Sequence, residues 1–119
     1  MDERLEKALE FSNFLETQNN QKRIFLEQYK NNLIHYVNGN KISVTMELIT
    51  FCKSMILLDQ ESIVLLDDNN TPFDVQDLKE FTRELLGVYT FASRKYLYDY
   101  NKIKNNRSVE GLTSLWNEV

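Results

Sequence analysis

The feature that most constrains the fold is a long helical pattern over residues 74–105. Its apolar residues recur at alternating steps of three and four, which is the spacing of one stripe along an α-helix. The stripe comprises Leu78, Phe81, Leu85, Tyr89, Ala92, Tyr96, Tyr100 and Ile103, and beside it lie Leu86, Val88, Phe91 and Leu97. Because the apolar surface is wider than one stripe, we expect neighbouring elements to cover more than one face of this helix.

The start of this helix is marked by four local signals. Asp74 is the predicted N-cap, and Asp77 stands three residues later, in the position of a capping-box acid. Phe73 and Leu78 occupy the two positions of a hydrophobic staple. Pro72 prevents a helix from running in from the N-terminal side. The pattern therefore predicts a helix that begins at Asp74.

Residues 2–32 predict another long helix. Its expected seam is Leu5, Ala8, Ser12, Leu15, Asn19, Lys22, Leu26, Tyr29 and Leu33. The middle of this seam is polar, so the helix either breaks near Asn19–Asn20 or continues with a polar layer that fixes the register of a partner helix. We favour the continuous helix because no Gly or Pro interrupts the run.

Residues 33–45 change from a helical period to the alternation of β-strands. Asn38–Gly39 is a strong hairpin signal, since both residues tolerate positive φ. A loop of residues 38–40 keeps four apolar side chains on one face, in the pairs Tyr36–Ile42 and Ile34–Val44. A two-residue turn would mix them with Lys41 and Ser43. We therefore predict the three-residue loop.

The remaining pattern predicts a further helix, a second hairpin and a short tail. Residues 46–58 form the helix, with Thr45 as its cap, and their few polar positions indicate that it is largely buried. Two short strands at 62–66 and 71–73 flank a turn. A short final helix or turn is predicted at 108–116, capped by Ser108. The predicted fold class is α+β, mainly helical, in the order α-ββ-α-ββ-α-(short α).

Composition favours a single domain over residues 1–119. The chain is 42% apolar and has only three Gly and one Pro, which argues against disorder and against an all-β sandwich. Neither a secretory signal nor a membrane span is predicted, so we expect a soluble protein. The single cysteine, Cys52, lies in an apolar run and indicates a buried, reduced thiol in an intracellular protein.

Helix lengths predict self-association. A helix of about 30 residues is roughly 45 Å long, whereas a domain of this size has a radius of gyration of roughly 13–14 Å. Two such helices cannot both be covered by the rest of one short chain, and monomers rarely expose large aromatic stripes. We therefore expect a homodimer or higher oligomer built on the two long helices.

Candidate catalytic and metal-binding residues are few. His35 is the only histidine and is expected to be a solvated strand residue, and nothing near Cys52 suggests a nucleophile. The acidic turn at 67–71 resembles a calcium loop only superficially, because Pro72 and Leu78 replace the Gly and Glu that such a loop needs. We therefore predict a non-enzymatic protein with no catalytic, cofactor-binding or metal-binding residues and no small-molecule ligand.

One stretch has the character of a binding surface, residues 94–107. Five cations against Asp99 give it a net charge of +4 in a chain of net −4. The candidate contacts for a partner or a nucleic acid are Arg94, Lys95, Tyr96, Tyr98, Tyr100, Lys102, Lys104 and Arg107. Cations could contact phosphates while tyrosines stack on bases. The simpler interpretation is that the cations complement the helix dipole and the tyrosines pack in a core or interface.

Five runs across most of the chain carry a family resemblance: EKALEFSNFLETQNNQKRI, YVNGN, ELITFCKSMILL, SIVLLDDNNTPFDVQDLKEF and IKNNRSVEGL. They resemble small uncharacterised proteins of marine tailed bacteriophages of the T-even type. The resemblance implies a phage product in the cytoplasm of a bacterial host or in the virion, and it assigns no activity to any residue. Our leading hypothesis is a phage-type interaction or structural protein that self-associates through its long helices. The alternative is a nucleic-acid-binding accessory factor that uses residues 94–107.

Overall fold

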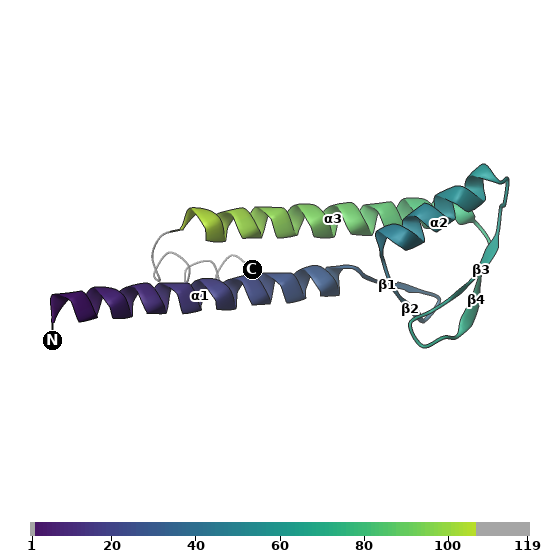
Figure 1. Ribbon diagram of the computed structural model, residues 1–119. Coiled ribbons are helices and arrows are strands. Elements are labelled where there is room, and N and C mark those ends of the chain that lie inside the picture. Colours follow the sequence, from purple (N-terminus) through teal and green to yellow (C-terminus); the bar gives the residue numbers. More distant parts are fainter. Residues whose placement is uncertain (1, 107–119) are drawn as a thin grey trace. The chain divides into compact units, whose positions relative to one another are not determined.

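The computed structural model describes residues 2–106. The elements are α1 (Glu3–Asn32), β1 (Ile34–Val37), β2 (Asn40–Ser43), α2 (Met46–Leu57), β3 (Ile63–Leu66), β4 (Pro72–Val75) and α3 (Leu78–Asn105) (Figure 1). This order confirms the predicted α-ββ-α-ββ-α arrangement of a mainly helical α+β fold. The short helix predicted at 108–116 lies outside the described residues.

The chain divides into two units. The helical unit comprises Met1–Gln28 and Lys95–Val119, and the hairpin unit comprises Tyr29–Arg94. In the helical unit, α1 and the last part of α3 run in opposite directions (Figure 1). In the hairpin unit, β1 and β2 form one antiparallel sheet, β3 and β4 form another, and both lie with α2 around the first part of α3.

The core of the hairpin unit confirms the first half of the stripe predicted on α3. Leu78, Phe81 and Leu85 are all buried. They pack with residues from both hairpins and from α2: Ile42, Val44, Ile49, Cys52, Phe73 and Val75. The hairpin unit therefore has its own apolar core, assembled from every element that it contains.

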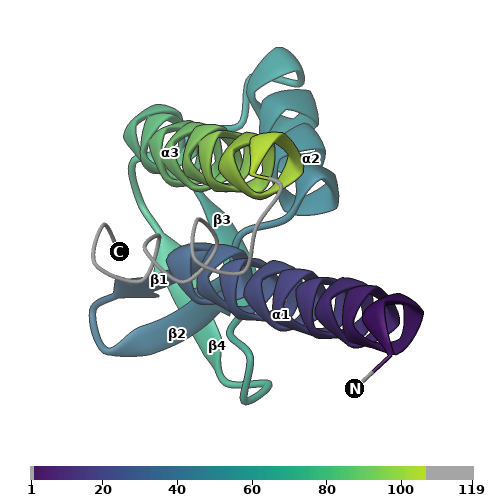
Figure 2. The same cartoon turned by 90° about the vertical axis from the view of Figure 1, so that its left-hand side faces the viewer.

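α1 is one uninterrupted helix, as predicted, without a break at Asn19–Asn20 (Figure 2). Its buried side is not the predicted seam, however. Gln21 and Phe25 are buried, and Phe14 packs on Phe25 and Ile103. The buried stripe thus lies one residue earlier than predicted, about 100° around the helix at 3.6 residues per turn. The prediction was wrong because α1 carries two apolar stripes, one with phenylalanines and one with leucines, and α3 packs against Phe14 and Phe25.

The register predicted for the first hairpin is also wrong. The pairs are Ile34–Ser43, His35–Ile42, Tyr36–Lys41 and Val37–Asn40. Asn38 and Gly39 have φ values of 51° and 82°, so both central residues of a two-residue turn take positive φ. This geometry matches the twist of the strands. The inward face consequently carries Val37 and Ile42, while Tyr36 is 65% exposed.

The acidic segment between β3 and β4 is a hairpin turn, as predicted. The Asp67 carboxylate accepts hydrogen bonds from the backbone N–H groups of Asn69 (2.8 Å) and Thr71 (2.9 Å). Asp68 links this turn to β2, because its N–H donates to the Lys41 carbonyl (2.8 Å) and its carboxylate accepts from the backbone N–H and hydroxyl of Ser43. Hydrogen bonds of Asp68 therefore connect the two hairpins.

α2 has the predicted cap but not the predicted burial. The Thr45 hydroxyl accepts a hydrogen bond from the Leu48 N–H at 3.1 Å. Of the residues in α2, Ile49 and Cys52 are buried, whereas Leu57 is 83% exposed. Apolar residues lie all round this helix, but other elements cover only the side that carries Ile49 and Cys52.

α3 begins at Leu78, four residues later than predicted, and its N-cap is Asp77 instead of Asp74. The Asp77 carboxylate accepts from the Glu80 N–H at 3.2 Å. Asp74 is unavailable because it belongs to β4, where it pairs with Val64. β4 extends to Val75, beyond the return strand predicted at 71–73. The helix therefore begins later in the chain than predicted.

The two aspartates should therefore differ in their effect on stability. Replacing Asp77 with Ala should lower the free energy of unfolding by about 0.5–2 kcal/mol, the usual cost of a lost N-cap. Replacing Asp74 with Ala should change it by less than about 0.5 kcal/mol, as expected for an exposed site. Urea denaturation of both variants measures the difference. A larger loss for Asp74→Ala would contradict this assignment of the cap.

Candidate functional site

The basic, tyrosine-rich end of α3 does not form one continuous surface. Lys95 Nζ lies 2.7 Å from Asp99 Oδ2, and the Asp99 side chain is only 10% exposed. A carboxylate this deeply buried needs a cationic partner to offset the loss of hydration. Lys95 therefore stabilises the buried Asp99 carboxylate. The predicted stripe included Tyr100 and not Asp99, but Asp99 is buried whereas Tyr100 is 38% exposed.

Two of the three tyrosines in this stretch face α1 within the helical unit. Tyr96 packs on Phe25 and Ile103. The rings of Tyr96 and Tyr100 meet edge to face, with centroids 6.2 Å apart, an arrangement that aromatic pairs favour. Lys22 of α1 places its Nζ 5.6 Å from the centre of the Tyr100 ring. These contacts show that Tyr96 and Tyr100 take part in the packing of α1 on the last part of α3.

The rest of the predicted stretch lies on the surface of α3. Tyr98 is 61% exposed, and Lys102 Nζ sits 4.3 Å from the centre of its ring. Arg94 and Lys104 are exposed. Arg107 lies outside the described residues. The structure thus separates the seven candidates that it describes into an inward group and an outward group.

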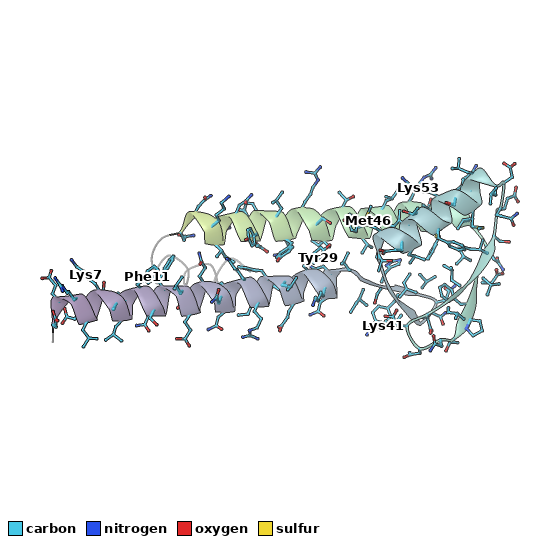
Figure 3. All side chains as sticks on the ribbon, in the orientation of Figure 1. Lys7, Phe11, Tyr29, Lys41, Met46 and Lys53 are labelled. Atoms are coloured by element: carbon cyan, nitrogen blue, oxygen red, sulfur yellow. The ribbon has the colours of Figure 1, made fainter. Side chains whose placement is uncertain are left out.

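A second exposed surface lies on α1, where it overlaps the seam predicted from the sequence. It consists of four leucines, which we name the leucine stripe: Leu5 (52% exposed), Leu9 (45%), Leu15 (40%) and Leu26 (37%). On another side of the same helix, Lys7 and Phe11 point in one direction (Figure 3). With Glu10 and Phe14 they line an open depression of about 400 Å³. The presence of two separate apolar stripes in α1 was the sequence signal that could have revealed this exposed face.

His35 and Cys52 have surroundings that the sequence did not reveal. His35 Nε2 lies 3.3 Å from Glu84 Oε2 of α3, and the histidine side chain is 25% exposed, so His35 is a strand residue, as predicted, but is only partly solvated. The two-residue turn places His35 on the same face as Ile42, towards α3. Cys52 is fully buried, as predicted. Burial raises the pKa of its thiol above the ordinary value, while a hydrogen bond with the Thr82 side chain acts in the opposite direction.

Within residues 2–106, no group of three or more His, Cys, Asp or Glu side chains could hold a metal ion. No helix in the described part of the chain is long and apolar enough to cross a membrane. An open depression of about 350 Å³ is lined by Gln60, Glu61, Gln76, Asp77 and Lys79. Two of these residues act in folding, since Asp77 caps α3 and the Glu61 carbonyl accepts from the Leu78 N–H. In comparisons with known proteins, neither a family model, nor a curated protein, nor a solved structure matches the chain.

Proposed function

We propose that this chain is a non-enzymatic interaction or structural protein that self-associates through its long helices. The observation that supports this proposal is the leucine stripe of α1, whose four side chains are 37–52% exposed. Large apolar side chains that recur along one exposed helix are typical of a surface that contacts a partner. A role as a phage product, in the host cytoplasm or in the particle, is the setting that the sequence resemblance suggests.

The expected strength of association follows from the exposed area. Full burial of a leucine side chain contributes about 1.5–3 kcal/mol. The stripe leucines are already roughly half buried, so eight of them across a dimer would contribute roughly 6–12 kcal/mol. Association costs about 4–15 kcal/mol in lost freedom of motion. These terms are similar in size, so we expect a dimer whose population depends on concentration.

The alternative function, an accessory factor that binds nucleic acid, draws on fewer residues than the sequence suggested. Arg94, Tyr98 and Lys104 are exposed, which favours it. Lys95 is paired with Asp99, and Lys102 occupies a face of the Tyr98 ring on which a base would stack. Both lysines would have to leave these contacts to bind a nucleic acid. Self-association does not require this, so it is the function that we prefer.

The proposal predicts a change of molar mass with protein concentration. Size-exclusion chromatography with light scattering should give twice the 14.2 kDa of one chain at high concentration and approach one chain on dilution. The apparent mass should change little between low and moderate salt, because apolar contacts dominate the stripe. A constant mass of one chain across the whole concentration range would overturn the proposal.

A further inference from the structure

We propose that two copies of the chain pair through antiparallel α1 helices, with the leucine stripes face to face. This inference rests on the proposed self-association and specifies its surface and direction. The stripe extends from Leu5 to Leu26 on one uninterrupted helix, so two copies could remain in contact over roughly 33 Å at 1.5 Å per residue. A pairing of this kind is two-fold symmetric and closes on itself, which gives a dimer and no fibre.

The spacing of the stripe is self-complementary when the helices run in opposite directions. Residues 5, 8, 12, 15, 19, 22 and 26 follow the three-and-four spacing of a coiled-coil seam. When Leu5 faces Leu26 of the second copy, Leu15 meets its own counterpart near the two-fold axis. Ser12 then faces Asn19 of the second copy. Ser12 and Asn19 thus form two matched polar layers, and a polar layer in a seam specifies register.

The charges of α1 favour this direction. Residues 2–16 carry five carboxylates against two cations, a net charge of −3, whereas residues 17–32 carry three cations against one carboxylate, a net charge of +2. Antiparallel pairing places each acidic half beside the basic half of the second copy. Parallel pairing would place like halves together. Charge complementarity of this kind determines the orientation of the two helices more than the affinity between them.

The ion pairs already present do not compete with this arrangement. Lys7–Glu3 at 3.6 Å and Arg23–Glu27 at 3.5 Å join side chains that are all more than 60% exposed. Exposed pairs of this kind contribute little and rearrange readily. Glu16 is adjacent to Leu15, which lies near the two-fold axis. In the antiparallel pair Glu16 would therefore lie close to Glu16 of the second copy, and the two carboxylates would repel each other. Replacing Glu16 with Gln should therefore tighten an antiparallel dimer.

Disulfide trapping in the full chain tests the direction. Ser12→Cys and Asn19→Cys are made separately, since both residues are exposed, and native Cys52 is fully buried. On oxidation, a mixture of the two variants should give a covalent heterodimer, whereas each variant alone should not. In the antiparallel pair the two copies of position 12 would be about 10 Å apart along the helices, beyond the roughly 7 Å limit between Cα atoms of a disulfide.

The other outcomes separate this inference from the proposed function. Covalent homodimers of each variant alone would indicate a parallel pair and overturn the antiparallel arrangement. A non-covalent oligomer without any crosslink would overturn the inference while leaving self-association intact. A monomer at every concentration would overturn both. Light scattering on the reduced variants, which should match the unmodified chain, shows whether the cysteines themselves disturb assembly.

Discussion

Replacing Leu85 with Ala should lower the free energy of unfolding by about 2–5 kcal/mol, the usual cost of removing a buried leucine. Leu85 has no exposed surface and lies in the core of the hairpin unit with residues from α2 and both hairpins. The loss combines the transfer of the side chain to water with the cavity that remains, which a rigid helix such as α3 cannot close. Since domains are stable by only about 5–15 kcal/mol, this change is a large fraction of the total.

Urea denaturation followed by circular dichroism measures this effect, and α2 offers a matched control. Leu57→Ala removes the same atoms from a side chain that is 83% exposed, so it should change stability by less than about 0.5 kcal/mol. Equal losses from the two variants would contradict the burial pattern described for the hairpin unit.

Replacing Leu15 with Asp should weaken self-association by roughly thirtyfold or more. In the proposed dimer Leu15 meets its own counterpart, so the change removes two leucines and places two carboxylates together. About 1.4 kcal/mol corresponds to a factor of ten in Kd, and the lost burial alone is roughly 1.5–3 kcal/mol across the dimer for two half-exposed leucines. Sedimentation velocity over a range of concentrations measures the shift.

The control for this experiment is Leu57→Asp. Leu57 is more exposed than any leucine of the stripe but lies on α2, outside the proposed contact. It should leave the Kd unchanged within about twofold, and both variants should keep their helical circular dichroism, since neither residue is buried. If Leu57→Asp dissociates the oligomer and Leu15→Asp does not, the association surface lies on the hairpin unit.

Most of the secondary structure could be predicted from the sequence because its determinants are local. The absence of Gly and Pro predicted a continuous α1, and Thr45 was recognised as the cap of α2. The turn at 67–71 also followed from its own residues, whose side chains bond to nearby backbone groups. Each of these features depends on groups within a few residues of one another.

The candidate site was predictable only in part. Its composition was visible, and Lys95–Asp99 is a local pair four residues apart, but the contact of Tyr96 with Phe25 of α1 does not follow from the spacing of cations and tyrosines. The face of α1 that α3 covers was also not determined by the sequence. Periodicity identifies that α1 has apolar faces but does not say which one a neighbouring helix will cover.

The sequence by itself determined the order of the elements, the continuity of α1 and the turn at 67–71. The tertiary structure decided the buried face of α1, the exposure of Leu57, the pairing of His35 with Ile42 and the choice of Asp77 over Asp74 as the cap. The physical reason is that local propensity acts through the backbone over a few residues. Burial and strand register depend instead on how much apolar surface distant segments remove from water together, and only the assembled fold sets that.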